Sequence, residues 1–363
     1  MKNIILPCGR PFVSFSTNDG HLFCLAANNK LQENMFCLNS LDMGYSITRT
    51  KYGDVYDTYL KVKQDNVINH NEIEKEILGN TKKFGEFIFN KLSEQQYLIL
   101  DLDVSKIINY NTDKQVTLHS PIVTGINLEN QTILLGDFFD FKHYDVQWVS
   151  LNEAYEAYEI IENYLKVFPR EGDDEWIRTT SLIQYNELKL QIRLDGVISD
   201  IQTYLSSEKI SFHTEQISAF HLVSSRIKGE NDIHEVTELL EVGSGVSYYN
   251  FLKTYTRKEF KKRDYKTVQS ASLLVTHFKI LKKSVNFMIK EFFLENSEEE
   301  PIDEMIKYAK QLEAYFLKNY IHGSDNDKIE KCLLLIDVIQ KLELDFLSKL
   351  ITKIELVEGG TNS

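Results

Sequence analysis

Hydrophobic and polar residues follow two different patterns along this chain, and the pattern changes near residue 150. In the first part, the spacing of apolar residues predicts two helices, over residues 22–33 and 71–93. Alternation and β-forming residues predict three strands, over residues 97–104, 115–126 and 131–139. The turn-rich residues 127–130 separate the last two strands and indicate a hairpin. The first part is therefore expected to mix helix and strand.

Helical spacing dominates after residue 150. Ser150 and Glu153 match a capping box, in which a hydroxyl and a carboxylate satisfy the first free amides of a helix. The spacing predicts helices over residues 150–166, 186–206, 230–240, 246–263, 267–294, 301–320 and 326–355. Residues 182–190 also fit a strand, and Gly323 fits a helix stop. The predicted fold class is α+β over residues 1–150, followed by an all-α half over residues 151–363.

The composition is that of a globular protein, since 42% of the 363 residues are hydrophobic and 26% are charged. No apolar run is long enough to cross a membrane, and the N-terminal run is too short for a secretory signal. We therefore expect a cytoplasmic protein without a membrane partner. The net charge of −13 argues against nucleic-acid binding, which needs basic surface to replace phosphate counterions.

The cysteines lie at positions 8, 24, 37 and 332, too scattered for a zinc site or a disulfide framework, so we expect no metal and free thiols. Cys24 lies at the expected start of a helix, where free amides and the helix dipole lower the pKa of a thiol. It also fits a buried small hydrophobic residue. We expect Cys8 in an irregular N-terminal arm, and Cys37 and Cys332 in the core.

His119 and Asp137 lie in successive predicted strands on either side of the hairpin. Neighbouring strands can place a carboxylate beside an imidazole, fixing its tautomer, and the imidazole can then deprotonate a thiol. Taken singly, His119 also fits a core histidine and Asp137 a turn cap. Together with Cys24, the two residues indicate a nucleophilic triad.

The stretch from Gly20 to Tyr158 resembles the papain-like superfamily, in its branch of bacteriocin-processing peptidases. It is more similar to the N-terminal domain family of the butirosin-biosynthesis acyltransferases. The resemblance rests on a His and a Cys near a helix start, a glycine turn, and a later His, Gly and Asp, which here are His21, Cys24, Gly44, His119, Gly125 and Asp137. It implies a papain-like fold, in which an N-terminal helix packs on an antiparallel sheet.

The resemblance also implies an activity. Members related to butirosin biosynthesis move an acyl group from a carrier-protein thioester to an amine, and a similar protease-like enzyme forms amides in closthioamide biosynthesis. Cys24 would then be the nucleophile in an amide synthetase of antibiotic biosynthesis. The only cofactor would be the phosphopantetheine of the carrier protein, and a small amine would be the acceptor. A peptidase with the same triad and a non-catalytic binding protein on the same fold are the alternatives.

An oxyanion hole would need hydrogen-bond donors. The backbone amide of Cys24 and the side chain of Asn18 are the candidates, although Asn18 also fits a simple turn residue.

Basic residues are concentrated between positions 253 and 290. This segment contains eleven Lys and Arg and two acidic residues, so its net charge is +9. A solvated helix surface, a membrane-binding surface and a docking surface for an acidic carrier protein all fit this segment. The candidate docking residues are Arg257, Lys258, Lys261, Lys262, Arg263 and Lys266.

Overall fold

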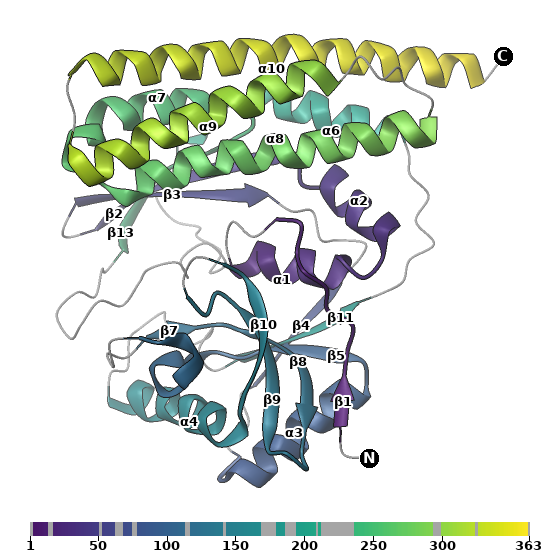
Figure 1. The fold of residues 1–363 in the computed structure, drawn as a ribbon, viewed down its shortest axis with the longest axis vertical. Helices are drawn as coiled ribbons and strands as arrows, with labels where there is room; N and C mark the ends of the chain where they lie inside the picture. The colour runs from purple at the N-terminus through teal and green to yellow at the C-terminus, as the bar shows by residue number, and fades with distance from the viewer. Residues whose placement is uncertain are drawn as a thin grey trace. The chain divides into compact units, whose positions relative to one another are not determined.

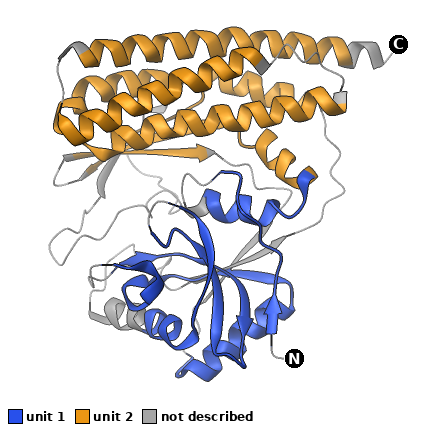
Figure 2. Ribbon diagram, in the orientation of Figure 1, with its two compact units in different colours: residues 1–30, 64–189, 217–234 blue, residues 31–63, 190–216, 235–363 orange. Residues whose placement is uncertain are grey.

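The computed structural model describes residues 3–13, 17–50, 53–61, 68–74, 78–112, 117–140, 143–167, 179–185, 194–207, 210–211, 236–292, 299–323 and 326–361. The chain divides into two compact units, each discontinuous in sequence (Figure 2). The first unit holds residues 1–30, 64–189 and 217–234, and the second holds residues 31–63, 190–216 and 235–363. This division differs from the single boundary expected at residue 150, because the strand Asp42–Thr50 pairs both with the strand Gly53–Lys61 and with the strand Val236–Ser244.

A seven-stranded antiparallel sheet is the centre of the first unit (Figure 1). Its strands follow the order β10–β9–β8–β5–β11–β4, and β1 pairs with β8. Their bounds are β1 Asn3–Ile5, β4 Ile68–Glu74, β5 Gln96–Ile99, β8 Ile122–Asn127, β9 Thr132–Asp137, β10 Asp145–Ser150 and β11 Thr179–Tyr185. The expected hairpin is confirmed between β8 and β9. There Asn127 Oδ1 accepts hydrogen bonds from the amides of Glu129 and Asn130 at 3.1 and 3.0 Å.

Three helices pack on this sheet, namely α1 Thr17–Ala26, α3 Thr81–Ser93 and α4 Leu151–Val167. Helix α3 buries Phe84, Phe87 and Ile88 on one face, which explains its apolar spacing. Half of the predicted capping box forms at α4, where Ser150 Oγ accepts from the Glu153 amide at 3.4 Å. The Glu153 carboxylate instead accepts from the Ile108 amide at 3.3 Å, so the reciprocal bond of the capping box is replaced by a tertiary one.

The second unit combines a four-stranded antiparallel sheet with long helices (Figure 1). The sheet order is β12–β13–β2–β3, with β2 Asp42–Thr50, β3 Gly53–Lys61, β12 Ile210–Ser211 and β13 Val236–Ser244. The helices are α2 Lys30–Leu38, α6 Leu194–Ser206, α7 Ser247–Glu259, α8 Tyr265–Phe292, α9 Glu299–His322 and α10 Asn326–Thr361, with a 3-10 turn η4 at Phe260–Lys262. Gly323 ends α9 as expected, with φ +80° and its amide bonded to the Asn319 carbonyl at 2.8 Å.

The α+β class is therefore confirmed, but the expected all-α second half is wrong. It contains β11, β12 and β13, and the helix predicted over residues 230–240 gives way to a strand from Val236. The helix predicted over residues 71–93 begins only at Thr81, because the preceding residues form β4. In both places long-range pairing between strands outweighs the local helical spacing. No helix among the described ranges is long and apolar enough to cross a membrane.

Candidate active site

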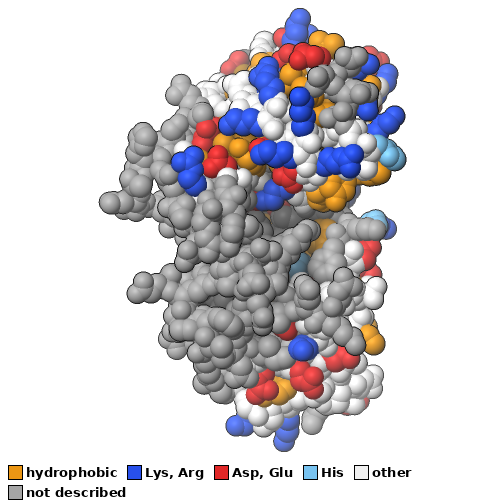
Figure 3. Space-filling view, turned by 90° about the vertical axis from the view of Figure 1, so that its left-hand side faces the viewer, with side chains coloured by type: hydrophobic (Ala, Val, Ile, Leu, Met, Phe, Trp, Pro, Cys, Tyr) orange, Lys and Arg blue, Asp and Glu red, His pale blue; other side chains and the backbone are white. Residues whose placement is uncertain are grey.

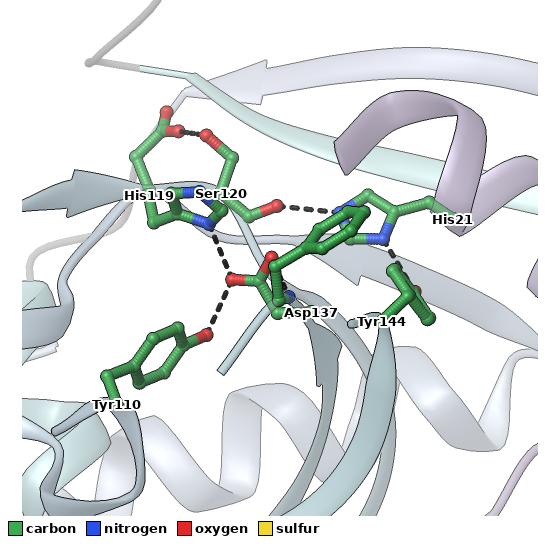
Figure 4. Close-up of polar contacts among 8 residues, drawn as sticks. His21, Tyr110, His119, Ser120, Asp137 and Tyr144 are labelled. Carbon is green, nitrogen blue, oxygen red and sulfur yellow. Dashed lines mark hydrogen bonds and ion pairs between the residues drawn. The ribbon is translucent and has the colours of Figure 1, made fainter. Parts of the chain in front are cut away.

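The predicted histidine and aspartate meet in the first unit. His119 is the last residue of β7 (Leu118–His119), which pairs with β6 (Leu102–Asp103), and Asp137 is the last residue of β9. His119 Nδ1 lies 2.6 Å from Asp137 Oδ2 (Figure 4). The strand expected over residues 115–126 is interrupted at Ser120 and Pro121, where proline offers no amide hydrogen for a sheet ladder. This break turns His119 off the main sheet and toward the end of β9.

Asp137 is completely buried and accepts several hydrogen bonds. The Tyr110 hydroxyl, at the end of the 3-10 turn η2 (Ile108–Tyr110), donates to Asp137 Oδ2 at 2.6 Å, and the Phe138 amide donates to Oδ1 at 2.8 Å. Burial by itself would raise the pKa of this carboxyl. The hydrogen bond and charge of His119, with smaller contributions from His21 and Tyr110, hold its pKa below the usual value. Asp137 is therefore a fixed anion.

A buried anion of this kind sets the tautomer of His119. The carboxylate can only accept, so the hydrogen of the imidazole lies on Nδ1, and Nε2 is the basic nitrogen of the neutral ring. The side chain of His119 is 22% exposed, against 0% for Asp137. Burial and the Asp137 charge also raise the pKa of Tyr110 well above its usual value, which keeps this hydroxyl a donor. The pair thus has the orientation needed for a general base.

His21 links helix α1 to the same region, although the motif assigned it no role of its own. Its Nε2 donates to the Ser120 carbonyl at 2.8 Å, so Nδ1 accepts from the Tyr144 hydroxyl, also at 2.8 Å. Burial lowers the pKa of His21 to about 4, so the ring stays neutral. His21 fixes the backbone beside His119 rather than acting as a base. In the sequence, the only signal for His21 was its position three residues before Cys24.

Tyr144 reaches His21 because two glycines make room for its ring. A β-carbon at Gly20 would lie 2.4 Å from the Tyr144 ring, and one at Gly136 would lie 2.7 Å from its hydroxyl oxygen. Either substitution would displace Tyr144 and remove the donor to His21 Nδ1. These glycines therefore support the site through packing.

Cys24 differs most from its expected setting. Helix α1 begins at Thr17, so Cys24 lies in its last turn, not its first, and the positive end of the helix dipole does not act on the sulfur. The Cys24 amide lies inside the helical hydrogen-bond ladder, which makes it unsuitable as an oxyanion donor. The other candidate donor, Asn18, lies in the first turn of α1, and its side chain is outside the described residues.

Cys24 also forms a disulfide bond with Cys8, so the expectation of a free thiol at both positions is wrong. The Cα atoms are 5.3 Å apart, within the usual range for a disulfide. The irregular arm that carries Cys8 crosses the end of α1, where the Gly9 amide donates to the Cys24 carbonyl at 2.9 Å. A β-carbon at Gly9 would lie 2.8 Å from that of Ala27, so these two small residues permit the close approach.

The other two cysteines fit their expected places. Cys37 and Cys332 are buried thiols outside the disulfide, and burial raises the pKa of the Cys332 thiol to about 12. Neither is suited to nucleophilic chemistry. Among the described residues, no group of His, Cys, Asp and Glu side chains is arranged to hold a metal ion.

A pocket of about 420 Å³ lies beside the Asp137 network in the first unit. Tyr110 and Phe139 line it with their rings, whose centroids are 4.7 Å apart, and the Tyr110 ring is 6.3 Å from that of His119. Its other lining residues include Asn109, Asp140, Asp145 and Gln147. The pocket therefore offers space for a polar molecule next to Tyr110.

No family model matches this chain, and no curated protein matches its sequence. The similarity to the butirosin-type acyltransferases therefore rests on the motif residues alone. One of these, Gly125, has a structural role here, because a β-carbon at this position would lie 3.0 Å from the Ile4 carbonyl where β1 pairs with β8.

Proposed function

We propose that this protein is a cysteine-dependent acyltransferase that forms amides, with Cys24 as nucleophile, His119 as base and Asp137 as the carboxylate that orients it. The contact between His119 Nδ1 and the buried Asp137 carboxylate supports this most strongly. Tyr110 adds support, because a donor on the same carboxylate oxygen restricts its position. The proposed fold of the first unit is papain-like, with α1 against β9 of an antiparallel sheet.

The reaction requires the reduced form of the protein. His119 Nε2 would take the Cys24 thiol proton, and the thiolate would attack a thioester carried by a phosphopantetheine arm. The carbon–sulfur bond to the arm breaks, and the imidazolium returns the proton to the leaving thiol. An amine then attacks the acyl-enzyme and gives its proton to His119, which returns it to the Cys24 sulfur. The net products are an amide and a free pantetheine thiol.

A non-catalytic binding protein is the second candidate, and the state of Cys24 favours it. The Cys24 side chain is completely buried, lies in the last turn of α1 and is bonded to Cys8. A small buried cysteine in a disulfide is also what a purely structural role would produce. In that case the contact between His119 and Asp137 would stabilise the first unit and nothing more.

Amide formation should be measurable with a small donor. Reduced protein, an acyl thioester of N-acetylcysteamine and a primary amine should give an amide, which liquid chromatography with mass spectrometry would quantify. Cys24→Ala and His119→Ala should each reduce the rate to the uncatalysed level, because one supplies the bond-forming sulfur and the other moves every proton.

The same assay separates the alternatives, with Cys332→Ser as the matched control for removal of a thiol. Release of free acid in place of amide, together with cleavage of peptide bonds, would identify a peptidase. Product formation that is independent of Cys24 would contradict the proposal, and the absence of any turnover would favour the binding protein.

A further inference from the structure

Four large apolar side chains are exposed together in the second unit, on α8 and α9. Leu317, Tyr320 and Ile321 of α9 follow helical i, i+3, i+4 spacing and therefore share one face. They are 42%, 41% and 55% exposed, and Tyr265, the first residue of α8, is 45% exposed. The rings of Tyr265 and Tyr320 are in contact, with centroids 5.4 Å apart. These four residues are called the apolar patch below.

Exposed cations border the apolar patch. The η4 turn is held against α9, because Asn319 Nδ2 donates to the Phe260 carbonyl at 2.5 Å. A β-carbon at Gly323 would lie 2.4 Å from the guanidinium of Arg263, so this side chain lies against the C-terminal end of α9. The cations that are exposed in this region are Arg257, Lys258, Lys261, Lys262, Arg263 and Lys318.

The nearby carboxylates neutralise Lys262 but are too few to offset the other exposed cations. Glu259 is buried and pairs with Lys262 at 2.8 Å. Asp264 accepts from the Tyr255 hydroxyl at 2.8 Å and from the Lys266 amide at 3.0 Å. Figure 3 shows Lys and Arg side chains gathered over this side of the second unit, although the whole chain carries a net charge of −13. The surface is thus a local positive region around an apolar centre.

Lys266, one of the residues expected in a docking surface, belongs to the fold instead. Its ammonium group pairs with Asp57 of β3 at 2.6 Å. Lys253 likewise pairs with Asp337 at 2.5 Å, and Lys283 pairs with Glu33. The basic segment therefore divides into cations that join elements of the second unit and cations that face solvent.

We infer that the apolar patch and its bordering cations form a docking site for an acidic amphipathic helix of another protein. An apolar centre with a polar rim and enriched in tyrosine and arginine is the usual anatomy of a protein interface. The positive border selects a partner with carboxylates beside its apolar residues. A nucleic acid fits less well, because Leu317 and Ile321 place aliphatic side chains beside the Tyr265 and Tyr320 rings, where a stacking surface would need further aromatic faces. The identification of this partner as the carrier protein that donates the acyl group rests on the proposed function.

Binding to the full-length protein can be tested with a fluorescein-labelled peptide that has leucines on one helical face and glutamates elsewhere. We expect an increase in fluorescence anisotropy on binding that is weaker at high salt. Tyr320→Ser with Ile321→Ser, and Lys261→Glu with Lys318→Glu, should each raise Kd by roughly tenfold or more. The matched charge control is Lys279→Glu with Lys349→Glu, on exposed parts of α8 and α10, and it should leave Kd within roughly twofold.

Three results would overturn the inference: equal binding of the patch variants and wild type, equal binding of a peptide with glutamine in place of glutamate, or tighter binding of a single-stranded oligonucleotide. Circular dichroism melting of each variant separates lost binding from lost folding. Turnover of the N-acetylcysteamine thioester should be the same in patch variants and wild type. If neither wild type nor any patch variant turns over the thioester, the proposed function alone is refuted. If the patch variants bind the peptide as wild type does, the docking site alone is refuted.

Discussion

Asp137→Asn should reduce amide formation by roughly 10³- to 10⁴-fold in kcat, because the tautomer of His119 would no longer be fixed. In the present structure Asp137 accepts from His119, Tyr110 and the Phe138 amide. The asparagine amide has one acceptor oxygen, so its NH₂ group must face at least one of these donors. Initial rates with the small thioester under reducing conditions would measure the loss.

A second Asp–His pair in the same unit provides the matched control. Asp140 Oδ2 lies 2.8 Å from His143 Nδ1, but both side chains are mostly exposed, at 54% and 79%. Asp140→Asn should therefore change kcat by less than about threefold, since solvent screens an exposed pair. Asp140 also lines the pocket beside Tyr110, so the comparison between the two variants is made on kcat and not on KM. Equal losses in the two variants would show that the contact between His119 and Asp137 has no special role.

The Asp137 pKa also predicts how stability depends on pH. A carboxyl whose pKa is lower in the folded state stabilises that state above its unfolded pKa of about 3.9. This contribution disappears as the pH falls through the lower folded value. Urea unfolding of wild type should therefore show a steeper loss of free energy below about pH 4 than Asp137→Asn. Parallel curves for the two proteins would contradict the assignment of Asp137 as a buried anion.

Oxidation of Cys8 and Cys24 should switch activity off completely. The disulfide leaves no thiol on Cys24, so oxidised protein should give no amide, and a dithiol such as dithiothreitol should restore activity as it is itself oxidised. Cys8→Ser should be active without any reductant, because Cys24 then has no partner for an internal disulfide. Rates measured in a series of thiol–disulfide buffers would show both effects.

Loss of the disulfide, by reduction or by Cys8→Ser, should lower the free energy of unfolding. A disulfide between residues 16 apart restricts the unfolded chain, and its loss costs about 3 kcal/mol of unfolding free energy. Denaturant unfolding of Cys8→Ser, compared with wild type in the presence and absence of reductant, would measure this. Reduced wild type and Cys8→Ser should agree with each other. A variant that loses stability but never gains activity would identify the disulfide as structural and favour the binding protein.

Local sequence patterns predicted the fold where neighbouring residues decide it. The turn at Asn127, the cap at Ser150 and the stop at Gly323 depend on chemistry within a few residues, and all three are present. The helix predicted over residues 230–240 failed because β13 is held by pairing with β2, almost two hundred residues earlier. Long-range pairing of this kind leaves no local signal, so the two discontinuous units were not predictable from spacing alone.

The candidate site was predicted in part, for a similar reason. His119 and Asp137 were expected together because a short hairpin connects their strands, and they are in contact. The sequence missed Tyr110, because its η2 turn reaches Asp137 only through tertiary packing. The sequence also predicted Cys24 at a helix start, because the apolar pattern begins at residue 22. The helix itself begins earlier, at Thr17. The bond to Cys8 depends on how the N-terminal arm crosses α1.

The central claim is that Cys24 carries the acyl group, and intact-protein mass spectrometry of Cys8→Ser tests it most directly. Incubated with an acyl thioester and no amine, this variant should gain the mass of one acyl group, and peptide mapping should place it on Cys24. A primary amine should then remove the group as an amide, because the thioester is more reactive than the amide it forms. No gain in mass on Cys24, or a gain equal in Cys8→Ser and in Cys8→Ser with Cys24→Ala, would contradict the claim.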